Sequence, residues 1–552
     1  MATRLIKRTP SAHDLPLLIK NILLTPLRFA PDNEIVYKDI KRYDYRTLNK
    51  RIGQFANVLK ELGIREGDIV GVLDYDSHRY LECFYTIPMM GAILHTVNIR
   101  LSPEQILYTI NHAEDDALLV HSDFLPLVEK LRGAMKTVKT IIVLNDHGPA
   151  PETGFEVAGE YEALLEKSPG GYDFPDFNEN SKATTFYTTG TTGAPKGVYF
   201  SHRQLMLHTL AIAAAMSMVA EGVSMSVKDV YMPLTPMFHV HAWGMPYVAS
   251  LLGVKQVYPG RYIPDEILAL IAKEGVSYTH SVPTILHMLL GCPSSASVDL
   301  SGLSVIIGGS ALPRGLCKAA RQRGINITAG YGMSETCPVL TVSALKPNMC
   351  ECGEEEKIDV RCRTGLPIPL VDLRVVDLEG RELPHDGDSV GEVVVRAPWL
   401  TLGYLQDPAG SEDLWAGGYM RTGDAGFVDP EGYLQLTDRL KDVIKSGGEW
   451  ISSLLIEDTL SQHPAVSEAA VIGVPDETWG ERPYAIVTIK EEQKGKFSEE
   501  DLKAFFQDFV NRGVISKWGV PDRIVVVESI PKTSVGKLDK KEIRKTAITQ
   551  SG

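Results

Sequence analysis

Cysteine is scarce, and no cysteine pattern points to a structural cross-link. The 552-residue chain contains seven cysteines, an odd number without the paired CxxC spacing of zinc or redox sites. Cys350, Cys352 and Cys362 are close in sequence, but no fourth ligand follows at zinc-finger spacing. We therefore expect reduced thiols, as in a cytoplasmic protein, and no disulfide framework.

Long apolar runs and net positive charge are also missing. No segment approaches the roughly 18 apolar residues of a membrane-spanning helix, and residues 1–16 have no signal-peptide core. The formal net charge of −14 argues against a general nucleic-acid binder. What is present is an ordinary globular composition, 44% hydrophobic and 23% charged, in a chain long enough for at least two domains.

Helical and strand-like patterns alternate through most of the N-terminal part. Residues 45–62 have apolar side chains at helical spacing, whereas 68–74, 117–121 and 140–144 are short apolar strands. Residues 168–182 are rich in proline, glycine and polar side chains and predict a loop. The alternation predicts an α/β fold with helices on largely parallel sheets.

The pattern changes towards the C-terminus. Residues 371–395 contain short, turn-linked segments that predict antiparallel strands. After residues 438–442 a compact α+β unit follows, with a helix at 454–463 and strands near 466–473 and 484–489. We predict an N-terminal domain, a hinge and a C-terminal domain with the bounds 1–437, 438–442 and 443–552.

The most informative segment is 187–197, with the sequence YTTGTTGAPKG. Its glycines allow close backbone approach to an anion, the threonines add hydroxyl donors, and Lys196 adds positive charge. The Walker A pattern GxxxxGK[ST] is absent, because Gly197 and Val198 follow the lysine. The segment predicts a phosphate-binding loop, with a flexible surface loop as the alternative.

This loop resembles the signature of the adenylate-forming superfamily, which includes acyl-CoA synthetases, firefly-type luciferases and peptide-synthetase adenylation domains. Further segments resemble the family's motifs in the family's order, namely 236–240 (PMFHV), 330–336 (GYGMSET), 421–424 (RTGD), 438–442 (DRLKD) and 531–537 (PKTSVGK). Each motif alone is weak or moderate evidence, but six in sequence over nearly the whole chain are specific.

The resemblance implies a large N-terminal domain of helix-covered sheets with a small β-barrel-like subdomain, and a small mobile C-terminal α+β domain. It also implies the chemistry. A carboxylate attacks the α-phosphate of ATP, pyrophosphate leaves, and the acyl-AMP then transfers its acyl group to coenzyme A. ATP, Mg²⁺ and coenzyme A are therefore the expected cofactor and co-substrates.

The family assigns nucleotide-site roles to matching residues of this chain. Phosphates would be held by Thr188, Thr189, Gly190, Thr191, Thr192, Gly193 and Lys196, and Mg²⁺ by Glu335 with Thr191. The adenosine site would comprise Gly309, Ser310, Ala311, Ala329, Gly330, Tyr331, Gly332, Ser334, Asp424 and Arg439. For Tyr331 a core tyrosine, and for Asp424 a turn-capping carboxylate, are the alternatives.

Catalytic and coenzyme A roles follow from the same resemblance. Catalysis would depend on His239, Glu335 and Lys537, the last carried to the α-phosphate by the C-terminal domain. That domain would rotate about Lys441 between half-reactions. The residues near the pantetheine path would be Lys445, Gly447, Gly448 and Trp450, although the two glycines alone also suit a plain turn.

The 236–240 motif and the residues after it indicate which class of carboxylic acid the site accepts. His239 and His241 alternate as on a strand, but a metal pair lacks a third ligand. Val240 and Trp243 would lie at the acyl site, where Trp243 resembles the gating tryptophan of fatty acyl-CoA synthetases; a core tryptophan is the competing interpretation. His239 follows Phe238, and the stretch to Tyr247 contains no acidic residue, in contrast to relatives that activate amino acids.

The sequence therefore predicts an apolar, medium- or long-chain fatty acid as substrate. Short thioether acids and aryl acids are the alternatives within the same chemistry. A luciferase-like oxygenase and a non-catalytic acyl-adenylate binder are the alternatives outside it. By resemblance to dimeric fatty-acid enzymes, a homodimer is a further expectation.

Overall fold

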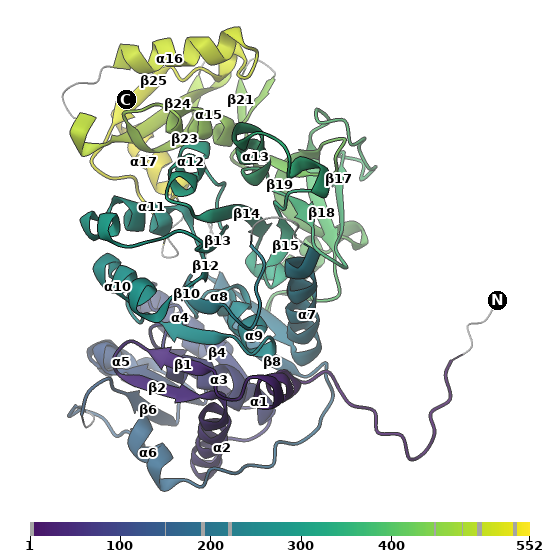
Figure 1. Cartoon of the computed structure of the whole chain (residues 1–552), viewed down its shortest axis with the longest axis vertical. Helices are drawn as coiled ribbons and strands as arrows, with labels where there is room; N and C mark the ends of the chain where they lie inside the picture. The colour runs from purple at the N-terminus through teal and green to yellow at the C-terminus, as the bar shows by residue number, and fades with distance from the viewer. Residues whose placement is uncertain are drawn as a thin grey trace.

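The computed structural model describes residues 5–148, 151–188, 194–218, 223–446, 449–476, 478–493, 499–533 and 538–551. Within these ranges the strands form four sheets. Figure 1 shows the last sheet and its helices, in yellow, at one end of the molecule, with the other three sheets below. No helix in the described ranges is long and apolar enough to cross a membrane.

One sheet has seven strands, parallel except for the antiparallel β8–β9 pair at its edge. Its order is β7 (Gly159–Glu160), β6 (Thr140–Leu144), β5 (Ala117–His121), β3 (Ile69–Leu73), β4 (Ile93–Thr96), β8 (Lys182–Thr188) and β9 (Lys196–Ser201). Helices of this part include α2 (Tyr45–Glu61), α3 (His78–Met89), α4 (Pro103–Ala113), α5 (Leu125–Leu131) and α6 (Tyr161–Lys167). The predicted phosphate loop thus joins β8 to β9.

A nine-stranded sheet carries most of the remaining motifs. Its order is β16 (Leu366–Pro367), β15 (Val339–Val342), β14 (Asn326–Gly332), β13 (Ser304–Ile307), β12 (Tyr278–Ser281), β10 (Val230–Leu234), β11 (Lys255–Tyr258), β1 (Glu34–Tyr37) and β2 (Lys41–Asp44). From β14 to β1 the strands are parallel. Their carboxyl ends therefore meet at one edge, where ligands bind in open α/β sheets.

Helices surround this sheet and connect its strands. They are α1 (Leu24–Phe29), α7 (His202–Met218), α9 (Met245–Leu251), α10 (Pro264–Glu274), α11 (Pro283–Gly291), α12 (Arg314–Gln322) and α13 (Glu354–Arg361). Buried apolar side chains of α10 and α12 form one core with those of β10, β13 and β14. The predicted α/β architecture with largely parallel sheets is confirmed.

The region expected to be barrel-like contains a four-stranded antiparallel sheet, with α14 (Pro408–Leu414) beside it. Its order is β17 (Asp372–Val376), β18 (Gly391–Arg396), β19 (Met420–Val428) and β20 (Leu434–Arg439). A backbone bridge between Gly365 and Leu434 links it to the nine-stranded sheet. The antiparallel prediction for this region is confirmed.

The C-terminal sheet has its own apolar core. It comprises β22 (Glu449–Ile451), β21 (Ile444–Ser446), β24 (Gly480–Ile489), β23 (Val466–Asp476) and β25 (Arg523–Val526), with α15 (Ser453–Ser461), α16 (Glu499–Asn511) and α17 (Lys540–Ser551). α15 contacts α12, where the Arg314 backbone N–H donates to Asp458 Oδ1 at 2.8 Å. The predicted strands are present and longer than expected.

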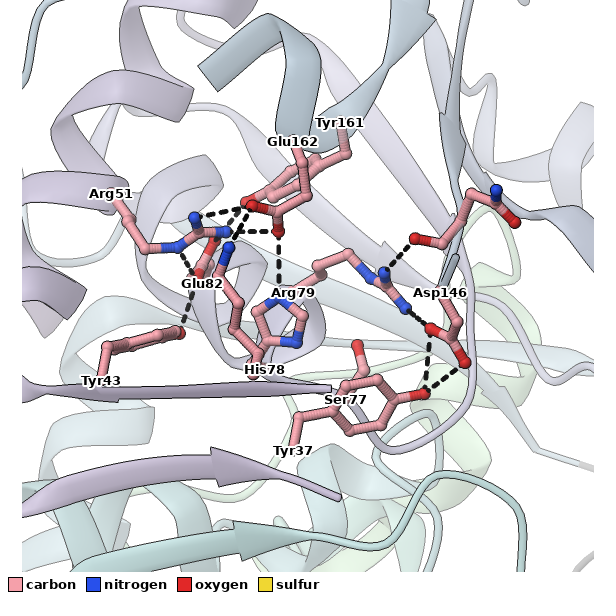
Figure 2. Close-up of polar contacts among 12 residues, drawn as sticks. Tyr37, Tyr43, Arg51, Ser77, His78, Arg79, Glu82, Asp146, Tyr161 and Glu162 are labelled. Atoms are coloured by element: carbon pink, nitrogen blue, oxygen red, sulfur yellow. Dashed lines mark hydrogen bonds and ion pairs between the residues drawn. The ribbon is translucent and has the colours of Figure 1, made fainter. Parts of the chain in front are cut away.

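A buried ion network holds the N-terminal helices together. Figure 2 shows the guanidinium of Arg51 between the carboxylates of Glu82 and Glu162. Arg51 Nε lies 2.7 Å from Glu82 Oε1, and its Nη2 lies 2.7 Å from Glu162 Oε1. The hydroxyls of Tyr43 and Tyr161 also donate to Glu82, whose side chain is fully buried. Each charged group in this network therefore has several partners.

Candidate active site

A cavity lies at the carboxyl edge of the nine-stranded sheet and holds about 790 Å³ of space, part of it open to solvent. Eight predicted site residues line it, namely His239, Val240, Trp243, Gly309, Gly330, Tyr331, Gly332 and Ser334. Most other lining residues are apolar, namely Ile212, Ala215, Met216, Val223, Met245, Ile306, Met333, Pro338, Val339, Val342 and Ile368. Segments that are distant in sequence thus converge on one apolar cavity.

Glycine is required at two positions of the wall by close backbone packing. A Cβ at Gly332 would overlap the carbonyl oxygen of Pro338. A Cβ at Gly308 would lie 2.9 Å from Trp243 Cη2 and 3.0 Å from the carbonyl oxygen of Gly330. Both glycines therefore let neighbouring segments touch where a side chain would separate them.

Tyr331 and Asp424 meet beside the cavity. The Tyr331 hydroxyl donates to Asp424 Oδ2 at 2.6 Å, and Arg439 Nε lies 2.7 Å from Asp424 Oδ1. Burial, and then the nearby carboxylate, raise the pKa of Tyr331 well above its usual range, so its hydroxyl remains a donor. Asp424 and Arg439 are opposite one another on β19 and β20. The predicted adenine and ribose residues therefore form one hydrogen-bonded cluster.

Glu335 is buried and held by a residue that motif comparison missed. The Tyr404 hydroxyl donates to Glu335 Oε1 at 2.8 Å, and the Thr401 N–H donates to the Glu335 carbonyl at 2.9 Å. Lys196 Nζ lies 4.3 Å from the centroid of the Tyr404 ring and 3.7 Å from Asp407 Oδ2. Tyr404 thus connects the predicted metal ligand to the predicted phosphate lysine, and no sequence pattern marks it.

Several predicted residues cannot be placed. Thr189, Gly190, Thr191, Thr192, Gly193, Gly447, Gly448 and Lys537 lie outside the described residues, as does the side chain of Trp450. Thr188 is described, and its backbone pairs with Lys196 at the start of β9. Of the two proposed magnesium ligands, the structure therefore describes Glu335 but not Thr191.

Other predicted residues lie away from the cavity wall. Ser310 and Ala311 follow Gly309 and are exposed, whereas Ala329 is buried behind the wall. Lys441 lies at the surface after β20, and the backbone N–H of Lys445 donates to Glu481 Oε2 at 2.9 Å. Lys441 and Lys445 are thus not among the residues that line the cavity.

The segment after His239 is not the strand that its alternating histidines predicted. Residues 240–243 have φ values of 49°, 55°, 48° and 59°, and Gly244 has 71°. A left-handed conformation costs a residue with a side chain about 1–2 kcal/mol, so four in succession require strong support. The prediction of a strand was wrong because tertiary contacts override the local pattern.

Buried hydrogen bonds supply this support. The backbone N–H of Met237 donates to Asp76 Oδ1 at 2.8 Å, and the Thr96 hydroxyl donates to the Phe238 carbonyl at 2.9 Å. His241 Nε2 lies 2.7 Å from the Thr184 hydroxyl. These contacts hold the segment just before the left-handed turn and the second residue of the turn, and the Trp243 indole lines the cavity wall.

Three histidines around this turn are fully enclosed. Burial lowers the pKa of His208, His241 and His280 to about 3. All three are therefore neutral at physiological pH. His208 Nε2 accepts the backbone N–H of Val339 at 3.2 Å. His280 lines the cavity and was not predicted from the sequence.

Two family models cover the chain. Residues 27–405 match the AMP-binding enzyme model, and residues 455–537 match the model of the AMP-binding enzyme C-terminal domain. The chain belongs to the AMP-binding enzyme family. This confirms the predicted membership of the adenylate-forming superfamily.

This AMP-binding enzyme is similar to acid–CoA ligases over nearly its whole length. It is 42% identical over 511 residues to the long-chain-fatty-acid–CoA ligase of Thermus thermophilus, covering 92% of this chain and 90% of the relative. It is 37% identical to the 3-methylmercaptopropionyl-CoA ligase of Ruegeria lacuscaerulensis, covering 97% and 98%. The crystal structure of an anthranilate CoA ligase in complex with anthranoyl-AMP superposes with a TM-score of 0.84 at 26% identity, covering 98% of this chain and 99% of that one.

Proposed function

We propose that this protein is an AMP-forming acyl-CoA ligase for medium- or long-chain fatty acids. The observation that carries the proposal is the apolar cavity that ends beside the Tyr331–Asp424–Arg439 cluster. A site for acyl-adenylate needs an apolar chamber next to groups that hold a nucleoside. Both are present at one edge of the sheet.

The first half-reaction joins two anions. A carboxylate oxygen of the acid forms a bond to the α-phosphorus of ATP, and the bond from that phosphorus to the bridging oxygen breaks, releasing pyrophosphate. Asp424 can accept hydrogen bonds from the ribose hydroxyls, and Tyr331 offers its ring to adenine. Lys196 and Lys537 would supply positive charge to the phosphates.

Glu335 suits a magnesium ligand because it is a buried carboxylate whose orientation Tyr404 fixes. Mg²⁺ held there would neutralise phosphate charge during pyrophosphate departure. His239 lines the cavity at the start of the left-handed turn, where it can face the carboxylate of the acid. These roles rest on the family resemblance and on the positions of the side chains.

In the second half-reaction the thiol sulfur of coenzyme A attacks the acyl carbon, and the bond to the AMP oxygen breaks. The thiol proton is lost, and the products are a thioester and AMP. We propose that the C-terminal domain, with the bounds 443–552, rotates about the 438–442 hinge between the two steps. A homodimer is part of the same proposal by analogy with fatty-acid relatives.

The lining of the cavity bears on the choice of acid. Among the residues that the structure describes, the walls carry no acidic side chain, so an ammonium-bearing acid would find no carboxylate partner among them. The number of apolar side chains favours a fatty acid over a short thioether acid such as methylmercaptopropionate. That short acid remains the second candidate because of the 37% identity to its ligase.

The half-reactions give the test. Pyrophosphate release should require both the fatty acid and Mg²⁺, and AMP and thioester should form only after coenzyme A is added. Oxygen uptake or light from acyl-AMP would instead indicate a luciferase-like oxygenase. Binding of ATP without pyrophosphate release would indicate a non-catalytic binder.

Lys537→Ala separates the two steps. We expect adenylation to fall by at least ~10²-fold, because one charged donor at the phosphate is lost. Conversion of supplied acyl-AMP to thioester should persist, since that step does not need the lysine in the site. Equal losses in both half-reactions would contradict the two-state proposal.

A further inference from the structure

His280 is a buried polar residue in the otherwise apolar part of the cavity wall. It lies on β12, where it is opposite Ile306 of β13, another lining residue. Neighbouring residues in register on parallel strands face the same side of a sheet, so both side chains face the cavity. The remaining polar lining residues, His239, Tyr331 and Ser334, belong to the motifs at the carboxyl edge.

The imidazole contacts two aromatic residues, Tyr231 and Trp243. Its Nε2 lies 2.8 Å from the Tyr231 hydroxyl, and these two rings are stacked with an interplanar angle of 10°. The Trp243 ring lies on it with a centroid distance of 5.0 Å and an angle of 38°. The orientation of His280 is therefore fixed, and the indole shields it.

The second ring nitrogen of His280 is unsatisfied. Nδ1 is buried and has no hydrogen-bond partner among the described residues. Burying such a group without a partner is costly, so an unpaired nitrogen in a cavity wall is available to a ligand or a water molecule. Burial also keeps the ring neutral, because it lowers the pKa to about 3. An uncharged hydrogen-bonding group is therefore held ready in the wall.

The position along the strand places this group on the acyl side. His280 is level with Ile306, two residues before Gly308, so it lies roughly 6–7 Å back from the carboxyl edge. Gly330 and Tyr331 of the nucleotide cluster lie at that edge. A ligand atom that reaches Nδ1 is thus part of the acyl group and lies several bonds from the carboxylate.

We propose that His280 selects a fatty acid that carries a hydroxyl group part-way along its acyl chain. Whichever nitrogen carries the proton, a hydroxyl can pair with Nδ1, because it both donates and accepts. A thioether sulfur accepts only weakly, and an alkyl chain does neither. The inference rests on the proposed ligase function and narrows its substrate class. The Trp243 indole must shift for the hydroxyl to reach the imidazole.

The test compares decanoic acid with the hydroxydecanoic acids, a set of positional isomers that carry one hydroxyl at successive carbons. The measured quantity is kcat/KM for pyrophosphate release. We expect one isomer to exceed the parent acid by about tenfold or more in the wild type. His280→Leu should remove this preference, and His280→Gln should retain part of it. Thr279→Val, a change at the preceding residue of the same strand, should leave the ratio unchanged because its side chain faces away.

Stability gives a readout that does not depend on substrate. Tyr231→Phe combined with His280→Leu removes both members of the polar pair, so the unfolding midpoint should stay level or rise. A large fall would mean that the pair is structural. No isomer preference in the wild type, or an equal loss of all acids in His280→Leu, would overturn the inference. Absence of pyrophosphate release with every acid would instead refute the proposed ligase.

Discussion

The buried ion network and the acyl cavity differ in how fully their buried polar groups are paired. In the network, Arg51, Glu82 and Glu162 have several partners each, although Glu82 has no exposed surface. In the cavity, His280 keeps an unpaired nitrogen, and residues 240–243 adopt a conformation that side chains disfavour. Unpaired buried atoms also occur next to the network, as at His78 Nδ1, so an unpaired atom alone does not mark a ligand site. In the cavity wall the unpaired nitrogen coincides with backbone strain, and this combination points to a site that binds a ligand.

The largest effect expected of any single substitution is in the network. Arg51→Met leaves the fully buried carboxylate of Glu82 without its cation, so we expect a loss of about 3–5 kcal/mol in the free energy of unfolding. Glu162 is 25% exposed and keeps Lys41 at 2.8 Å. Urea denaturation measures this loss. Arg381→Ala, which removes the exposed Arg381–Asp377 pair, should leave the midpoint within experimental error. If both substitutions lowered the free energy of unfolding equally, the buried ion pairs would contribute no more to stability than the exposed pair.

Acidification should weaken the cavity region next. His208, His241 and His280 have folded pKa values of about 3, below the unfolded value of about 6.5. The unfolded state then binds more protons between these values, so stability is complete above pH 6.5 and falls as the pH drops towards 3. Each histidine should cost ~2 kcal/mol between pH 6.5 and 5. His208→Gln should make the measured slope shallower, and an unchanged slope would contradict this origin.

The strained turn can be tested at its glycine. Gly244→Ala should cost about 1–2 kcal/mol, because its φ is 71° and a Cβ would lie 3.0 Å from His208 Nδ1. Gly302→Ala is the matched control, with φ of 81° and no atom within 4 Å of the added Cβ. Thermal unfolding measures the loss of stability in both variants. Gly302→Ala reports backbone strain alone, so a smaller loss there than at Gly244 gives the additional cost of crowding against His208. A larger loss at Gly302 would show that the turn is not tightly packed.

The smallest expected effect is at Tyr404. Tyr404→Phe removes the hydroxyl that orients Glu335, so the Mg²⁺ concentration for half-maximal pyrophosphate release should rise about tenfold. The unfolding midpoint should hardly change. Tyr419→Phe, which removes a hydroxyl paired with Asp372 at the surface, is the control. An unaltered Mg²⁺ dependence in Tyr404→Phe would argue against Glu335 as a ligand.

Much of the fold and part of the site could be predicted from the sequence. Apolar periodicity located α2 and β5, and glycine-rich motifs located Gly330, Tyr331 and Asp424 beside one cavity. Those signals are local, because each depends on neighbouring residues in one segment. They can therefore be detected without knowledge of the tertiary structure.

Residues that act through long-range contacts could not be predicted. Tyr404 reaches Glu335 across 69 positions, and His280 meets Trp243 from another strand. The left-handed turn after His239 depends on Asp76 and Thr96, which are distant in sequence. Period-based interpretation assigned a strand there because it includes no such contacts.

The most direct test is a structure of this protein with a non-hydrolysable analogue of a fatty acyl-adenylate. The account predicts adenine against Tyr331, ribose hydroxyls on Asp424, and the acyl chain inside the cavity, with the Trp243 indole displaced from His280. An acyl chain that lies outside the cavity, or a ribose that does not contact Asp424, would contradict it.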